Sequence, residues 1–340
     1  MVAPKAKPDT PRKPRVERTT STGSIERTVP ESTAPLASDK GAETAPRPPL
    51  KGRRALTAFK TAPFPYEGAL PYEERPFLDQ DVEGRRGRLL PHTDKILWQD
   101  ETHSDDRVLL YVPRDFSPTE PALIVLFFHG HDARLIRDVE RRQAVLHQVE
   151  QSGLNAVLVA PHFARDAADS SAGKFWQPGT AAAFLEEAAL QLSFLGGKRL
   201  LAPLKRAPVV LIAYSGGYAP AAWTLHHGGI DDRITGVVML DGMYGEYQKF
   251  ADWMDRRRDA FFVSAYGPSA QNGNMELRRL LADRDYRKVS ALRGRLDPGS
   301  ITFVATSSEL SHQDFVTRAW TGDPVTDVLA RLPQFTRRVR

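Results

Sequence analysis

The stretch Leu211–Trp223, LIAYSGGYAPAAW, places a serine where its hydroxyl could act as a nucleophile. Val209–Tyr214 is apolar and strand-like and Tyr218–His227 favours a helix, so Ser215 falls on a strand-to-helix turn. A turn this tight requires small residues two positions before and after the serine, and the chain has Ala213 and Gly217 there. The helix that follows offers free amides that stabilise negative charge. The pattern predicts an exposed nucleophile, with a plain turn as the alternative.

The elements that hold this serine alternate between buried strands and helices. Continuous apolar or strand-like runs predict strands at 107–112, 122–129, 155–160, 209–214, 234–240, 260–265 and 301–306. Segments with helical spacing separate most of them. The alternation predicts an α/β fold with a mainly parallel sheet and helices on both faces. Ligands of such sheets gather at the carboxyl ends of the strands, which is where Ser215 lies.

With a serine on such a turn, the chain resembles the α/β-hydrolase superfamily over residues 107–330, and more loosely over 87–106. The superfamily's nucleophile pattern is G-x-S-x-G, and Ala213 stands here in its first small position. The resemblance implies a serine hydrolase that cleaves a carboxylic ester or amide through an acyl-enzyme on Ser215. An esterase is the first expectation, because an ester has the better leaving group. A peptidase, an amidase and a thioesterase stay open.

The second motif is FFHGHD at 127–132, just after a predicted strand. The superfamily often carries His-Gly in this loop, where a backbone amide helps to bind the oxyanion. The resemblance implies that the amide of Gly216 acts together with that of His131 or of Gly130. Gly130 also has a purely structural interpretation, because glycine turns the chain sharply out of a strand.

The resemblance implies the catalytic order Ser…Asp/Glu…His. Histidines downstream of the serine are His226, His227 and His312. The first two lie on the helix after the serine and point along it. His312 follows the last predicted strand, where the superfamily places its base, and is therefore the expected base.

The orienting acid is the least constrained of the three residues. The commonest superfamily position follows strand 260–265, but YGPSAQNGN at 266–274 contains no carboxylate. Asp241, directly after strand 234–240, is the expected acid. Glu309 and Asp314 are rivals close to His312 in the sequence. Asp241 also has a structural interpretation, in which it only binds loop amides.

The long irregular segment Pro161–Gly179 follows another strand end. Loops in this position often form walls or lids of a site. Phe175 and Trp176, together with Tyr244, are expected either to line a substrate cleft or to pack loops onto the body.

Two other classes of function remain to be weighed. His129, His131, Asp132 and His162 lie near two strand ends and could bind zinc in a metal-dependent hydrolase. That interpretation leaves the serine turn without a role. The other alternative is a non-catalytic hydrolase-like scaffold that binds through a basic tail. The serine mechanism itself needs no metal and no organic cofactor.

The composition separates a tail from a body. Residues 1–60 hold 13 Lys and Arg against six Asp and Glu, whereas the remaining residues are slightly acidic. The tail is rich in Pro, Ser and Thr and is predicted to be disordered. It is the only part expected to contact anionic partners. Residues 61–340 are expected to form one catalytic domain that acts on a small-molecule or peptide-like ester or amide.

Location and redox chemistry are only weakly constrained. The sequence contains no cysteine, which excludes disulfides and thiolate metal sites. No apolar run reaches the length of a membrane span. The N-terminus also lacks the apolar segment of a secretory signal. A cytoplasmic location is the resulting expectation.

Overall fold

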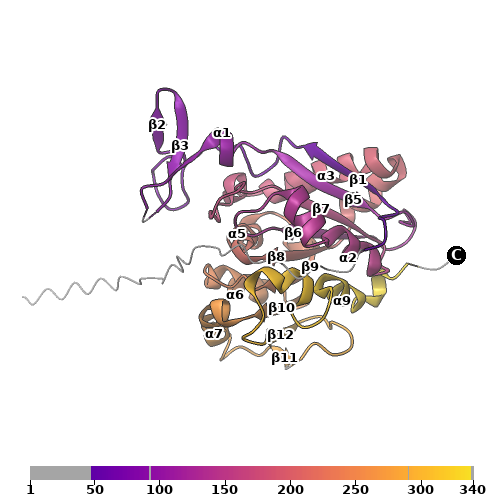
Figure 1. Cartoon of the computed structure of the whole chain (residues 1–340). Helices are drawn as coiled ribbons and strands as arrows, with labels where there is room; N and C mark the ends of the chain where they lie inside the picture. The colour runs from indigo at the N-terminus through magenta and orange to yellow at the C-terminus, as the bar shows by residue number, and fades with distance from the viewer. Residues whose placement is uncertain (1–46, 92, 290, 338–340) are drawn as a thin grey trace, which may run out of the picture. The chain divides into compact units, whose positions relative to one another are not determined.

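A large sheet organises the part of the chain that the structure describes. The computed structural model describes residues 47–91, 93–289 and 291–337. Their main sheet has the strand order β1-β5-β7-β6-β8-β9-β10-β12-β11 (Figure 1). The bounds in that order are Arg53–Ala58, Arg107–Val112, Ala156–Pro161, Leu123–Phe128, Val209–Tyr214, Ile234–Leu240, Phe261–Tyr266, Ser300–Ala305 and Arg287–Val289. Strand β5 is antiparallel to both neighbours, and the other neighbouring pairs are parallel.

The sheet divides the hydrophobic core into two layers. All six residues of β6 are buried, as expected for a strand covered on both faces. Because side chains alternate along a strand, Ile124 and Leu126 lie in one layer, whereas Val125 and Phe127 lie in the other. Continuous apolar runs such as LIVLFF are therefore the sequence signature of this architecture.

Helices cover both layers. The first layer packs against α3 (Thr180–Gly196), α4 (Leu201–Arg206), α5 (Tyr218–His227), α6 (Tyr247–Arg256) and α7 (Gln271–Leu280). The second packs against the π-helix η1 (Leu135–Arg142), α2 (Val145–Gln151), α8 (Phe315–Arg318) and α9 (Pro324–Ala330). The predicted α/β fold with a mainly parallel sheet and helices on both faces is confirmed.

A smaller antiparallel sheet precedes β5 in the chain. It consists of β2 (Gln80–Val82), β3 (Arg85–Leu89) and β4 (Ile96–Trp98), followed by the short helix α1 (Gln99–Thr102). Figure 1 shows β2 and β3 at one end of the molecule. The segment before β2 packs into the first core layer through aromatic side chains, among them Phe59, Phe64 and Phe77.

The predicted start of the folded domain at residue 61 is too late. Residues 53–58 form β1, which pairs with β5 over six residues. The main-chain amides of Lys60 and Thr61 bind the Glu187 carboxylate at 3.0 and 2.9 Å. Composition misses this segment because backbone pairing, rather than apolar side chains, offsets the entropy of ordering it. Residues 1–46, the rest of the predicted disordered tail, lie outside the described residues.

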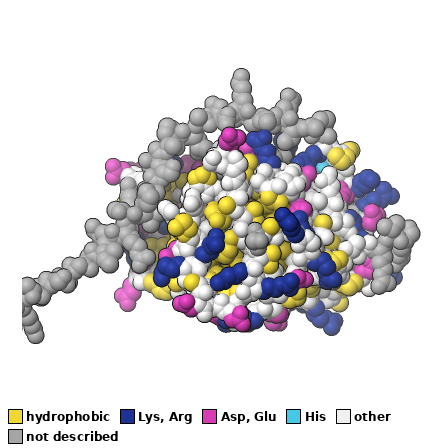
Figure 2. All heavy atoms as spheres, turned by 90° about the horizontal axis from the view of Figure 1, so that it is seen from below, with side chains coloured by type: hydrophobic (Ala, Val, Ile, Leu, Met, Phe, Trp, Pro, Cys, Tyr) yellow, Lys and Arg dark blue, Asp and Glu magenta, His cyan; other side chains and the backbone are white. Residues whose placement is uncertain are grey.

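The described surface carries charges of both signs. Figure 2 shows one face, on which basic and acidic side chains both occur among apolar and neutral ones. This agrees with the near balance of charge outside the tail. Within the described ranges, each helix is too short or too polar to cross a bilayer.

Candidate active site

Ser215 sits on a strained turn at the carboxyl end of β8. It begins a short 3-10 turn, Ser215–Gly217, that leads into α5. Its φ of 50° lies in the left-handed region, which is unfavourable for a residue with a side chain. A Cβ on Gly217 would lie 2.7 Å from the carbonyl oxygen of Phe128, and one on Gly130 would lie 2.7 Å from Ser215 Cβ. Close packing against β6 therefore enforces the small residues around this serine.

A hydrogen-bonded chain joins three residues that are distant in the sequence. His312 Nε2 is 2.7 Å from Ser215 Oγ, and His312 Nδ1 is 2.6 Å from Asp241 Oδ2. An ionised carboxylate only accepts, so Nδ1–H donates to Asp241 and Nε2 is left to accept the serine proton. Asp241 is fully buried, whereas the side chain of His312 is 37% exposed. The structure thus brings together the three residues predicted for the triad.

The carboxylate of Asp241 is held on several sides. The Gly267 amide donates to Oδ1 at 2.9 Å, and the hydroxyl of Ser269 donates to Oδ2 at 2.6 Å. Burial acts to raise the pKa of Asp241, but hydrogen bonds from His312, Ser269 and Gly267 outweigh it and lower the pKa below its usual value. The group is therefore ionised at neutral pH.

The loop after β10 supplies this support without a carboxylate. Because β9 and β10 are parallel neighbours, their carboxyl ends meet, and Gly267 and Ser269 reach the side chain of Asp241. The sequence shows that this loop lacks an acid, but it does not indicate the role of Ser269. Tyr244, expected near the site, donates from its hydroxyl to Ser269 Oγ at 3.2 Å.

The rival acids lie elsewhere. The side chain of Asp314 forms an ion pair with Arg318 at 2.5 Å. Glu309 is exposed, and its backbone amide binds the hydroxyl of Ser307. The ring of Tyr214 stacks on that of His312, with centroids 5.2 Å apart, and so helps to orient it. The hydroxyl of Tyr214 also donates to the main-chain oxygen of His312 at 3.1 Å.

The His-Gly loop touches the serine turn, as expected for a shared site. A Cβ on Gly216 would lie only 2.2 Å from His131 Cδ2 and 3.0 Å from Ser170 Oγ. His131 Nε2 is 2.7 Å from Ser170 Oγ. Burial lowers the pKa of His131, against the opposing effect of nearby aspartates, and favours a neutral ring. Ser170 was not identified from the sequence, because DSSAGK carries no signal beyond that of a polar loop.

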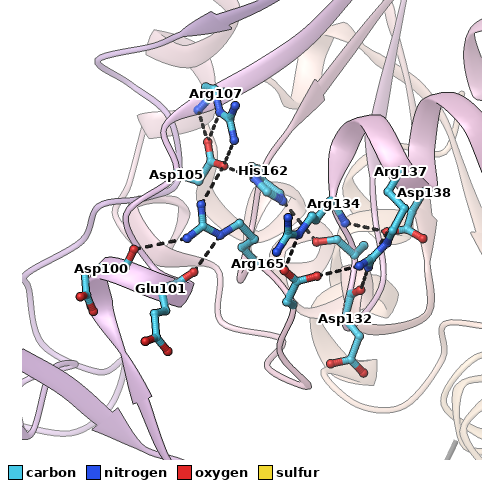
Figure 3. A network of polar contacts seen from close by, with 12 residues as sticks. Asp100, Glu101, Asp105, Arg107, Asp132, Arg134, Arg137, Asp138, His162 and Arg165 are labelled. Carbon is cyan, nitrogen blue, oxygen red and sulfur yellow. Dashed lines mark hydrogen bonds and ion pairs between the residues drawn. The ribbon is translucent and has the colours of Figure 1, made fainter.

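A network of ion pairs holds the loop that carries His131 (Figure 3). The amide of Asp132 donates to the Ala167 carbonyl at 3.0 Å, and the side chain of Arg137 donates to the carbonyl of Asp132. Arg137 also binds Asp166 at 3.0 Å, and Arg134 contacts the same carboxylate. The loops after β6 and β7 are thereby tied together on the side of the sheet where Ser215 lies.

The histidines predicted as possible metal ligands contact other groups of the protein. His129 Nδ1 donates to the carbonyl of Gly130 at 2.7 Å, and its Nε2 accepts from the amide of Phe163 at 2.9 Å. Burial lowers the pKa of His129 to about 3, so the ring is neutral. His162 Nδ1 lies 2.9 Å from Asp105. Among the described residues, no group of three or more His, Cys, Asp or Glu side chains is arranged to hold a metal ion.

A cavity of about 260 Å³ opens beside the serine turn. It is lined by Ala219 and Trp223 of α5, by Ser170 and by Trp176. Phe175, for which either a cleft or a packing role was expected, is fully buried among Phe128, Phe163 and Phe184. Phe175 and Trp176 are adjacent in the 3-10 turn Gly173–Trp176, so their side chains point in different directions.

No protein-family model matches the sequence, and no curated protein matches it. Solved structures are similar to it at low identity. The feruloyl esterase module from Clostridium thermocellum is 15% identical with a TM-score of 0.44, over 80% of this chain and 96% of that one. An S-formylglutathione hydrolase from Agrobacterium tumefaciens is 9% identical with a TM-score of 0.43, over 76% and 98%. A thermostable esterase from Pseudomonas putida is 10% identical with a TM-score of 0.40, over 77% and 86%.

The molecule itself defines the class of fold. The mostly parallel sheet with helices on both faces and the strained serine on the turn after β8 match an α/β-hydrolase-type fold, as the sequence predicted. The similarity to the solved structures is distant, and a shared fold does not by itself indicate a shared substrate.

Proposed function

We propose that this chain is a serine hydrolase that cleaves carboxylic esters through an acyl-enzyme on Ser215. The observation that carries the proposal is the continuous hydrogen-bonded chain from Ser215 through His312 to Asp241. A serine hydroxyl is a weak nucleophile until a positioned base takes its proton, and the base in turn needs an orienting group.

The chemistry follows from the positions of the three side chains. His312 Nε2 takes the proton as Ser215 Oγ attacks the substrate carbonyl, and the resulting imidazolium is stabilised by the ionised Asp241. His312 then gives the proton to the leaving alcohol as the carbon–oxygen bond breaks. In the second half, the neutral ring accepts a proton from water as that water attacks the acyl-enzyme. The imidazolium then returns the proton to Ser215 Oγ as the bond to the acyl carbon breaks and the acid leaves.

Negative charge on the carbonyl oxygen needs donors that are already in place. The amide of Gly216, at the start of the 3-10 turn, and the amide of His131 or Gly130 are the proposed oxyanion hole. Contact between Gly216 and the ring of His131 supports this, because it places both loops at the same point. Removal of one such donor typically costs about 10²–10³-fold in kcat.

Esters are proposed ahead of amides because the alcohol is the better leaving group. The decisive experiment treats the full chain with a fluorescent fluorophosphonate probe and with 4-nitrophenyl acetate. Wild type is expected to be labelled and to release nitrophenol, and Ser215→Ala and His312→Ala to do neither.

Matched controls are Ser308→Ala and His226→Ala, because both side chains are exposed and lie outside the hydrogen-bonded chain. They are expected to behave as wild type, and circular dichroism checks that every variant is folded. Labelling that survives in Ser215→Ala would place the nucleophile elsewhere and overturn the proposal. So would a folded wild type that neither the probe nor the ester modifies.

A further inference from the structure

The cavity near the serine turn is lined by residues of two kinds. The apolar ones are Leu70, Pro71, Pro91, Trp176, Ala219 and Trp223. Ala219 lies about one helical turn after Ser215 in the sequence. Ser170 also lines the cavity, and its hydroxyl oxygen lies 3.0 Å from the position that a Cβ on Gly216 would occupy. The volume of about 260 Å³ is slightly below the roughly 300–1,000 Å³ of pockets that bury a whole drug-sized ligand. The cavity therefore fits one ring-sized part of a substrate.

Five other lining residues are charged: Glu73, Arg75, Arg88, Asp169 and Glu246. A fatty acyl chain placed there would cover these groups without giving them hydrogen bonds, which is unfavourable. The lining therefore disfavours a long alkyl group.

Each of these charges already has a partner of opposite sign. Arg75 binds Glu73 at 2.9 Å, and Glu246 binds Lys249 at 2.5 Å. The most buried pair is Arg88 with Asp169 at 3.2 Å, where Asp169 also binds His103 at 2.8 Å. An ionic ligand would have to compete with these partners, and breaking the buried Arg88–Asp169 pair would be strongly destabilising.

Paired charges retain hydrogen-bonding capacity toward neutral groups. A carboxylate has about four acceptor positions and a guanidinium five donors, so one pair can accept from a hydroxyl and donate to its neighbour. Trp176 and Trp223 add apolar side-chain surface to the lining. This combination suits a ring that is apolar on its faces and hydroxylated at its edge.

We propose that the cavity binds a neutral, hydroxyl-rich ring of the substrate, so that the chain hydrolyses sugar-type esters. This inference rests on the proposed function for the hydrolysis, but the binding of the ring can be measured separately. The ring can belong to either side of the ester bond, to the alcohol or to the acid, and matched substrates separate these two sources.

The kinetic experiment compares esters of a hydroxylated sugar ring with esters of a cyclohexane ring of the same size. On the alcohol side, glucose 6-acetate is compared with cyclohexylmethyl acetate. On the acid side, methyl glucuronate is compared with methyl cyclohexanecarboxylate. On one of the two sides, the hydroxylated ester is expected to have a kcat/KM about ten times higher or more, since each hydrogen bond to a charged group is worth severalfold. Equal rates within both pairs would overturn the proposal.

Variants at the exposed rim test which residues make the difference. Glu73→Ala and Arg75→Ala change side chains that are 51% and 54% exposed, so the fold is expected to tolerate them. Each is expected to lower kcat/KM for the hydroxylated ester about 3- to 10-fold relative to kcat/KM for the alkyl ester. The control is Arg279→Ala, which removes an exposed Arg–Glu pair on α7. A loss that is the same for both esters would contradict a role in recognition.

Direct binding distinguishes failure of this inference from failure of the proposed function. Methyl glucoside is titrated into the wild type while tryptophan fluorescence is followed, with cyclohexylmethanol as the apolar match and Trp176→Phe as the reporter control. A saturable change with the glucoside alone, reduced in Glu73→Ala, is expected even if no ester is cleaved. No change, or the same change with both compounds, would overturn the proposed cavity ligand, whatever the protein's activity as a hydrolase.

Discussion

Two Asp–His pairs in this molecule are alike in distance and opposite in setting. Asp241 and His312 approach to 2.6 Å, and Asp105 and His162 to 2.9 Å. The second nitrogen of His312 faces a serine hydroxyl, whereas that of His162 lies 3.3 Å from the carbonyl of Ala133. The side chain of His312 is 37% exposed, but that of His162 is only 2% exposed.

The difference shows that an Asp–His pair alone does not make a catalytic site. A histidine acts as a base only when its free nitrogen meets a group that can lose a proton, at a place a substrate can reach. His162 meets a carbonyl acceptor inside the network of Figure 3, which joins the α1–β5 connection to the loops after β6 and β7. We therefore expect the first pair to control activity and the second to control stability.

The largest expected effect separates the two histidines. His312→Ala is expected to lower kcat by about 10⁴–10⁶-fold with little change in stability, because it removes the base. His162→Ala is expected to retain most of the activity but to lose about 3 kcal/mol of unfolding free energy, because Asp105 stays buried with one partner fewer. Ester hydrolysis and urea unfolding measure the two effects. A His162→Ala protein as inactive as His312→Ala, yet equally stable, would abolish the distinction.

The two aspartates give the next largest contrast. Asp241→Asn is expected to lower kcat by about 10³–10⁴-fold, because an amide can no longer hold the required tautomer of His312. Asp105→Asn is expected to leave kcat within a few-fold of wild type. Steady-state kinetics on one chromogenic ester tests both variants, and a full rate for Asp241→Asn would show that another group orients His312.

The buried pair also predicts how stability depends on pH. Burial acts to raise the pKa of Asp105, but hydrogen bonds from Arg107, together with the neighbouring His162 ring, lower it far below its ordinary value of 3.8. A depressed pKa in the folded state stabilises the fold above pH 3.8, and this stabilisation is lost as the pH falls below that value. Its loss is expected to cost about 2 kcal/mol.

Asp105→Asn is therefore expected to be less stable than wild type at pH 7, with a smaller further loss at pH 3. Urea unfolding at the two pH values measures this difference. The exposed Asp283→Asn serves as the control and should match wild type at both. If Asp105→Asn lost as much stability on acidification as wild type does, the assigned role of Asp105 would be wrong.

The smallest expected effect concerns the support of Asp241. Ser269→Ala removes the hydroxyl that donates to Oδ2 at 2.6 Å and is expected to lower kcat about 3- to 10-fold with KM unchanged. Ser269→Thr keeps the hydroxyl and is expected to restore most of the rate. If threonine failed to rescue while both variants remained folded, packing rather than the hydrogen bond would explain the loss.

Local sequence patterns were sufficient to predict the fold class and the serine turn. Buried strands of a parallel sheet read as apolar runs because both faces are covered, and this holds for β6, β7, β8 and β10. The serine turn was predictable because its constraints act within a few residues. Strand β1 was not predicted, because its partner β5 lies more than 40 residues away along the chain.

By itself, the sequence determined most strands of the main sheet, the serine turn and the candidates for its partners, because these depend on residues close together in the chain. Only the tertiary structure decided which carboxylate binds His312. Glu309 is three residues away in sequence and faces solvent, whereas Asp241 is 71 residues away and hydrogen-bonded. The order β9-β10-β12 brings the two strand ends that carry Asp241 and His312 to the same edge of the sheet. Contacts of this kind depend on how the strands pair, and strand pairing is not encoded in any single stretch of residues.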